Sequence, residues 1–241
     1  EFISTPYDLE SLDFLKKIKV KSIKTASADL SDIMLHKNIS KLNVRTIIST
    51  GMFNINEIKK TLSVYGNKKN VELLHCVSNY PCSYESLNLN NITTMRDKLK
   101  LPVGFSDHSL GYDSAIIAYM LGARTFEKHF TLSKKMIGPD HNASADPKEF
   151  ELYVNKIKLI NTILGSKIKK IRSEEMQMKK ISCKSITTRY FIKKSSILTK
   201  NNLIMKRPGI GLSGYDLKKI VGRKVKKNLH KDHQIKFSDV E

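Results

Sequence analysis

Short apolar runs alternate with longer amphipathic stretches over the first two thirds of the chain. The stretches have the spacing of amphipathic helices, and strands that alternate with helices of this length predict βα units and a parallel sheet. Their spacing is typical of a barrel or a doubly wound sheet. The apolar runs lie at residues 2–3, 20–26, 45–49, 71–77, 102–105 and 123–126, and the helical patterns at residues 8–18, 55–66, 84–99 and 114–123.

A different pattern begins after a further predicted helix at residues 147–164. Gly165 is placed to end that helix, and residues 166–183 are polar and rich in lysine, which predicts a linker. Residues 184–241 alternate in short segments and contain a turn-rich stretch, PGIGLSGYD. We therefore expect an α/β domain over residues 1–165 and a small β-rich domain over residues 184–241.

A polar cluster follows each apolar run, where the predicted strand ends. In parallel α/β folds the carboxyl ends of the strands carry the chemistry, and six polar ends in succession exceed what turns require. Six strands are also too few for a closed eight-stranded barrel, so we expect a fragment. The clusters are Ser4–Asp8, Lys24–Asp29, Ser49–Gly51, Ser78–Pro81, Ser106–His108 and Glu127–His129.

Two histidines occupy matching positions at successive strand ends. His108 follows one predicted strand in SDHSLG, and His129 follows the next in EKHF. Neutral imidazoles on rigid strand ends are natural ligands for a divalent metal, and the neighbouring Asp107 offers a carboxylate. The alternative, that each is a hydrogen-bonded structural histidine, stays open at this point.

Short hydroxyl side chains recur at the same ends, and together they suit a phosphate or a carboxylate. Each alone is equally a turn former or a helix N-cap. Lys24 could hold an anion, and the turn Gly138–His141 offers a carboxylate and a third imidazole on a loop. The hydroxyls are those of Thr5, Ser27, Ser49 and Ser106.

The charge balance is strongly basic, with 43 Lys and Arg against 23 Asp and Glu, for a net charge of +20. Only seven of the cations are arginine, and the lysines are spread along the chain. Clustered arginines are typical of nucleic-acid binders, so we expect an acidic small substrate and no nucleic-acid partner. The three cysteines lack a CxxC spacing, which indicates a reducing, cytoplasmic compartment. No apolar run reaches the ~20 residues that span a bilayer, so we expect no membrane partner.

The strings at the strand ends form a recognisable set. They resemble, in order, the catalytic barrel of the sialic acid (N-acetylneuraminate) synthase family: STPYDLESLDFL, KTASADL, ISTGM, LLHCVSNYP, GFSDHSLG, EKHFT and GPDHNAS. The tail, SILTKNNLIMKRPGIGL followed by GRKVKKNLHKDHQI, resembles that family's C-terminal antifreeze-like, or SAF, domain. The resemblance implies a (β/α)8 TIM barrel lacking its first two strands, followed by the small SAF domain. Glu1 then corresponds to the third strand.

The resemblance also implies an activity. Phosphoenolpyruvate would condense with an N-acetylated hexose, N-acetylmannosamine or a related sugar, and phosphate would be released. His108 and His129 would hold a divalent ion, Mn²⁺ with Mg²⁺ or Co²⁺ as alternatives, which polarises the open-chain aldehyde. Asp29 and Asp140 would contact the sugar. Phosphoenolpyruvate would be bound by Thr5, Lys24, Ser27, Ser49, Ser78, Tyr80 and Ser106.

Arg207 matches the arginine that the family's C-terminal domain inserts into the barrel of the other subunit. The active unit would then be a domain-swapped homodimer. A rival function from another class is an inactive or regulatory remnant whose SAF-like domain binds a carbohydrate or a partner subunit. The choice among N-acetylneuraminic, legionaminic and pseudaminic acid stays open.

Overall fold

The computed structural model describes all 241 residues and divides them into two compact units, residues 1–165 and residues 166–241. Each unit has its own hydrophobic core. None of the helices combines the length and the apolar character that crossing a bilayer needs.

The first unit is built on a parallel sheet in which every strand pairs with its neighbours in the sequence. The spatial order is β1-β2-β3-β4-β5, so the chain winds in one direction and the sheet stays open as a half-barrel. The predicted parallel α/β architecture is confirmed. The strands are β1 (Ser22–Thr25), β2 (Arg45–Ser49), β3 (Val71–His75), β4 (Val103–Asp107) and β5 (Phe126–Lys128).

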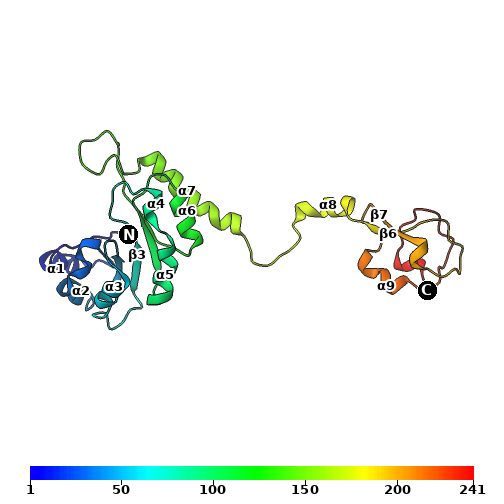
Figure 1. Ribbon diagram of the computed structural model, residues 1–241, viewed down its shortest axis with the longest axis horizontal. Coiled ribbons are helices and arrows are strands. Elements are labelled where there is room, and N and C mark those ends of the chain that lie inside the picture. Colours follow the sequence, from blue (N-terminus) through cyan, green and yellow to red (C-terminus); the bar gives the residue numbers. More distant parts are fainter. The chain divides into compact units, whose positions relative to one another are not determined.

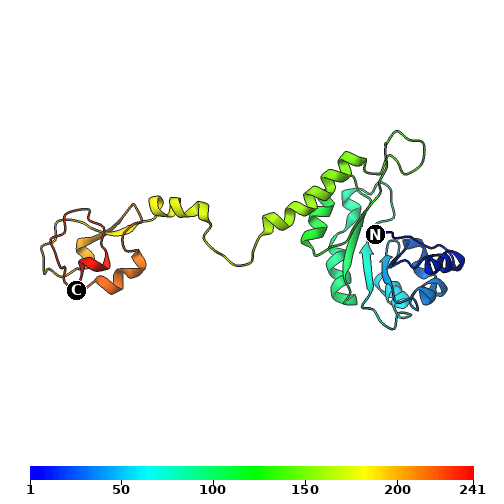
Figure 2. The same cartoon turned by 180° about the vertical axis from the view of Figure 1, so that it is seen from behind.

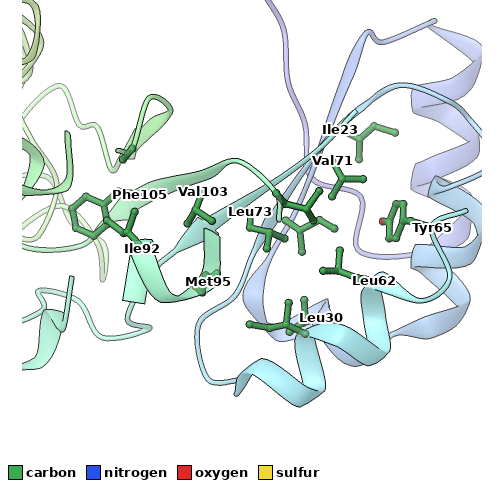
Figure 3. Close-up of a cluster of buried hydrophobic side chains, with 14 of the residues drawn as sticks. Ile23, Leu30, Leu62, Tyr65, Val71, Leu73, Ile92, Met95, Val103 and Phe105 are labelled. Carbon is green, nitrogen blue, oxygen red and sulfur yellow. The ribbon is translucent and has the colours of Figure 1, made fainter. Parts of the chain in front are cut away.

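Alternation along each strand gives the sheet two different faces. One face packs against the helices and supplies fully buried side chains such as Ile23, Leu73 and Phe105. Figure 3 shows Phe105 beside Ile92 of helix α5 in this core. The other face turns its polar residues, at the carboxyl ends of the strands, away from that core.

The helices lie around the outside of the strands in both Figure 1 and Figure 2. Helix α7 begins at a capping box formed by Asp146 and Glu149 and ends at Gly165, whose φ is 57°. Gly165 therefore ends the helix as the sequence predicted. The helices are α1 (Leu9–Lys17), α2 (Ile33–Ile39), α3 (Ile55–Leu62), α4 (Tyr84–Leu87), α5 (Asn90–Leu99), α6 (Asp113–Met120) and α7 (Pro147–Leu164), with a 3₁₀ turn η1 (Ser27–Ser31).

Three elements differ from the sequence-based expectation. The pattern at residues 84–99 forms two helices, because Asn88 takes a left-handed φ of 43° that ends α4. The first apolar run forms only a single parallel bridge, between Ser4 and Ile23. The last strand begins at Phe126 instead of Ala123.

The second unit is a small β-rich fold. Strands β6 (Ser185–Thr188) and β7 (Leu203–Lys206) pair antiparallel, and four isolated antiparallel bridges tie the remaining segments together. Its helical elements are α8 (Ser173–Ser182), η2 (Lys200–Asn202), η3 (Gly214–Asp216), α9 (Leu217–Ile220) and η4 (Phe237–Asp239). Helix α8 lies within the expected linker and has no buried residue. The fully buried side chains of the core are Ile186, Leu198, Ile220, Val225 and Ile235.

Candidate functional site

The carboxyl ends of the parallel strands surround one cavity of about 540 Å³. Nine of the twelve side chains predicted for the site line it, and they come from the bridge at Ser4 and from all five strands. This convergence follows from the parallel order, because every strand ends at the same edge. The nine are Thr5, Lys24, Ser27, Ser49, Ser78, Tyr80, Ser106, His108 and His129.

The two predicted imidazoles face each other in this cavity. The ring centroids of His108 and His129 are 5.5 Å apart and the rings are perpendicular. His108 Nδ1 lies 2.6 Å from the carbonyl oxygen of Val77, so Nδ1 donates and the lone pair on Nε2 points toward Ser106 Oγ, 3.2 Å away. Burial lowers the pKa of His108, and His129 adds to that shift, so the neutral ring is favoured.

An aromatic ring covers this pair. The ring centroid of Tyr80 lies 4.2 Å from that of His108 and 5.1 Å from that of His129. Burial is the main cause of the raised pKa of Tyr80, and nearby negative groups, including Glu127 and Asp140, add to it. Tyr80 therefore keeps its proton and can act as a hydrogen-bond donor.

Glu127 is a site residue that the sequence analysis did not single out. Ser106 Oγ donates to Glu127 Oε2 at 2.6 Å, and Lys24 Nζ lies 3.3 Å from Glu127 Oε1. The carboxylate therefore links the ends of β1, β4 and β5. A signal was present, since Glu127 lies two residues before His129 on a strand and so must share its face.

Gly51 allows several polar side chains to converge on one point. Its amide donates to Ser27 Oγ at 3.0 Å, and Ser27 Oγ lies 3.2 Å from Cys76 Sγ. A Cβ at Gly51 would lie 2.5 Å from Ser78 Oγ and 3.0 Å from both other atoms. Only glycine leaves this space open.

The three remaining predicted residues do not line the cavity. Asp29, in η1, is half-buried, and burial followed by the charge of Asp32 raises its pKa. Asp140 is exposed on the loop after β5. Arg207 lies in the second unit, where its Nε donates to the carbonyl oxygen of Ser182 at 2.9 Å.

Asp107 does not join the two histidines, contrary to the carboxylate suggested from the sequence. It is fully buried and pairs with Lys128, whose Nζ lies 3.1 Å from Asp107 Oδ2. The strand alternation explains this, because a residue next to His108 must point to the opposite face. The chain contains no group of three or more His, Cys, Asp or Glu side chains arranged to hold a metal.

Comparison with known proteins matches both units. The NeuB family matches residues 1–169 and the SAF domain matches residues 184–241. The N,N'-diacetyllegionaminic acid synthase of Campylobacter jejuni is 38% identical over 239 residues, covering 98% of this chain and 72% of that protein. A pseudaminic acid synthase of the same species is 32% identical over 239 residues, covering 98% and 69%.

A solved structure agrees with these matches. The N-acetylneuraminic acid (sialic acid) synthetase from Leptospira borgpetersenii, crystallised with citrate, has a TM-score of 0.66 and is 35% identical to this chain. The alignment covers 72% of this chain and 61% of that one. The resemblance drawn from the strand-end strings and the tail is therefore confirmed. Since the family match spans the whole parallel sheet with its cavity, the chain belongs to the NeuB family and carries a SAF domain over residues 184–241.

Proposed function

We propose that the strand-end cavity condenses phosphoenolpyruvate with an N-acetylated hexose, giving a sialic acid-type nonulosonic acid and phosphate. The observation that carries the proposal is the convergence of nine predicted polar side chains on one cavity of about 540 Å³. Two relatives are named for different products, legionaminic and pseudaminic acid. The proposal therefore names the class of hexose, with N-acetylmannosamine as one candidate.

The chemistry of the cavity suits an anion with a phosphate and a carboxylate. The Lys24 side chain is only 18% exposed, so its charge acts in a partly dry environment. Ser49 Oγ is buried and has no hydrogen-bond partner in the protein. Leaving a buried hydroxyl without a hydrogen-bond partner costs free energy, unless a ligand or a water molecule supplies that partner. Lys24 and the surrounding hydroxyls are the groups that we assign to phosphoenolpyruvate.

The residues also fit a divalent metal. His108 has its Nδ1 committed to a backbone carbonyl, which leaves the lone pair of Nε2, beside Ser106 Oγ, as the ligand atom, and His129 stands opposite it. Two imidazoles with oxygen donors nearby suit Mn²⁺, and also Mg²⁺ or Co²⁺. We propose that His108 and His129 hold the ion, which when bound would polarise the aldehyde of the open-chain hexose.

In the proposed reaction, C3 of phosphoenolpyruvate forms a bond to the aldehyde carbon, and the aldehyde oxygen takes up a proton. Water adds at C2, the C2–O bond to phosphate breaks, and C2 becomes a ketone. Lys24 and the hydroxyls orient the phosphate and the carboxylate. Glu127 is held by Ser106 and Lys24, and the Tyr80 ring keeps water from one side of the imidazoles.

Residues outside the cavity lining complete the proposal. Asp29 and Asp140 would contact the hexose. Arg207 would reach a substrate in the partner's cavity, which makes the active unit a domain-swapped homodimer. Mixing Arg207→Ala with His129→Ala protein tests this arrangement, because each mixed dimer holds one intact site. Recovered activity supports the shared site, and no recovery despite demonstrated subunit exchange contradicts it.

We also propose that the open sheet belongs to a (β/α)8 barrel. The order β1-β2-β3-β4-β5 has no reversal, as in a singly wound barrel, whereas a doubly wound sheet reverses its order at a switch point. The barrel would require further parallel strands between β5 and the segment at Ser4, which already bridges to β1.

Phosphate release tests the function. The chain is incubated with phosphoenolpyruvate, Mn²⁺ and either N-acetylmannosamine or a di-N-acetylated hexose, and the product is identified by mass spectrometry. His108→Ala/His129→Ala protein should lose turnover, whereas His230→Ala, an exposed histidine of the second unit, should keep it. Phosphoenolpyruvate binding without turnover by the unaltered chain would favour the regulatory alternative. Absence of binding would contradict the proposal.

A further inference from the structure

A buried ion pair joins the ends of the last two strands of the parallel sheet, just before the two imidazoles in the sequence. Asp107 ends β4 and Lys128 ends β5, and the two residues are opposite each other in the strand register. Lys128 Nζ lies 3.1 Å from Asp107 Oδ2, and the side chains are 4% and 0% exposed, respectively. Each member of the pair directly precedes one of the histidines, His108 or His129.

The groups around the pair contact it through hydrogen bonds and a cation–π contact, which restrict the directions of both side chains. The Asp107 carboxylate accepts hydrogen bonds from Ser109 N at 2.9 Å, from Ser109 Oγ at 2.6 Å and from Ser114 Oγ at 3.1 Å. The Lys128 ammonium also donates to the carbonyl oxygen of Ser109 and lies 5.3 Å from the centroid of the Tyr153 ring. The pair thus connects β4, β5 and the start of α6, and it lies against α7.

Burial of two charges is not an efficient way to stabilise a fold, because desolvation offsets much of their attraction. Two apolar side chains of similar volume could fill the same space. They would not fix a distance or a direction between the strand ends, whereas an ion pair with several hydrogen bonds fixes both. The feature that requires a fixed distance between the strand ends is the spacing of the two imidazoles that follow them.

The two histidines depend on this spacing to different degrees. His108 has an anchor of its own in its 2.6 Å hydrogen bond to the Val77 carbonyl. The His129 side chain makes no hydrogen bond within the chain, and its ring contacts are the rings of Tyr80 and His108. The orientation of His129 therefore relies on the backbone that Lys128 holds.

We propose that Asp107 and Lys128 are a positioning pair that holds His129 at the separation from His108 at which both imidazoles reach one divalent ion. This inference rests on the proposed metal site. Asp107 is fully buried, and Lys128, although it lines the cavity, has its ammonium bound to Asp107 and to the carbonyl oxygen of Ser109, so the pair acts through the strand ends.

Cobalt binding tests the inference without any assay of turnover. The full chain is titrated with Co²⁺, and both the dissociation constant and the visible absorption spectrum at saturation are recorded. In Lys128→Met protein the affinity should fall by about 10- to 100-fold, the range for losing an outer partner of a metal ligand. The saturated spectrum should change, because one imidazole no longer reaches the ion.

Two further variants separate positioning from stability. Lys134→Met removes the same side-chain type from the exposed pair with Glu149, whose atoms are 2.6 Å apart, and should leave cobalt binding unchanged. Asp107→Asn/Lys128→Met removes both charges and should refold better than the single variant, while its spectrum stays altered. If either variant that lacks Lys128 kept the spectrum and the affinity of the unaltered protein, the positioning role would be overturned, and the metal proposal would stand. Absence of cobalt binding by the unaltered chain would overturn the metal proposal together with it.

Discussion

A methyl group added at Gly104 should separate the two strands that carry the imidazoles. Gly104 is buried in β4, and a Cβ there would lie 2.5 Å from the backbone oxygen of Thr125 and 2.7 Å from Leu74 Cδ2. The same Thr125 oxygen accepts the hydrogen bond from Phe105 N at 2.9 Å. A backbone atom cannot rotate away as a side chain can, so β4 and β5 must shift.

The size of the effect follows from two costs and one gain. Overpacking of a core typically costs about 1–3 kcal/mol, and a weakened ladder hydrogen bond adds about 1 kcal/mol. The reduced freedom of the unfolded chain returns about 0.4–1 kcal/mol. Gly104→Ala should therefore lower the free energy of unfolding by about 1–3.6 kcal/mol. At roughly 2–4 °C per kcal/mol for a domain of this size, the melting temperature should fall by about 2–14 °C.

Urea denaturation followed by circular dichroism measures this change, and the chain offers a matched control. Gly66 is exposed and a Cβ there would meet nothing within 4 Å, so Gly66→Ala should stay within about 0.5 kcal/mol of the unaltered protein. Equal stability of the two alanine variants would refute the reasoning, because it would mean that the β4–β5 contact is not tight.

Three other outcomes are expected. Ser49→Ala should leave the stability unchanged, because Ser49 Oγ has no partner in the protein, yet calorimetry should show phosphoenolpyruvate affinity reduced by about 10- to 100-fold; unchanged affinity would remove Ser49 from the site. Glu127→Gln should tighten phosphoenolpyruvate binding by roughly 1.4- to 5-fold, because it releases Lys24 from a partly exposed pair, and weaker binding would contradict this. Burial lowers the pKa of His36 and of His75, so below pH about 6.5 the unfolded chain takes up protons that the folded chain does not. The urea midpoint should therefore fall from pH 7 to pH 5, and it should fall less in His36→Asn protein; an equal fall would exclude His36 as a cause.

The sequence was sufficient for the parallel sheet and for most of the cavity, because both depend on local rules. His108 and His129 were found from their position after apolar runs, and the parallel order brought them together. Strand alternation, applied to single residues, predicts that Asp107 points away from the histidines and that Glu127 lies on the same face as His129. The strand alternation assigns each residue of a polar cluster to one of the two faces of the sheet.

Other features depend on contacts that no local pattern encodes. The break between α4 and α5 rests on one left-handed residue, Asn88, inside a sequence that reads as continuous helix. The Asp107–Lys128 pair joins residues 21 positions apart, and its burial depends on α6 and α7. These features require the packed structure.

The alternation of the two sheet faces has a consequence for how this protein can change during evolution. Phe105 belongs to the core on the helix side of the sheet, and Asp107 points to the same side, whereas their immediate neighbours Ser106 and His108 line the cavity. Substitutions at the cavity positions can therefore change the lining of the cavity while the neighbouring core positions stay fixed. An insertion or a deletion within a strand, in contrast, moves all the following residues of that strand to the opposite face. Loss of one residue from β4 before Ser106 would turn Asp107 into the cavity and His108 into the core, so length variation should be confined to the loops between the strands.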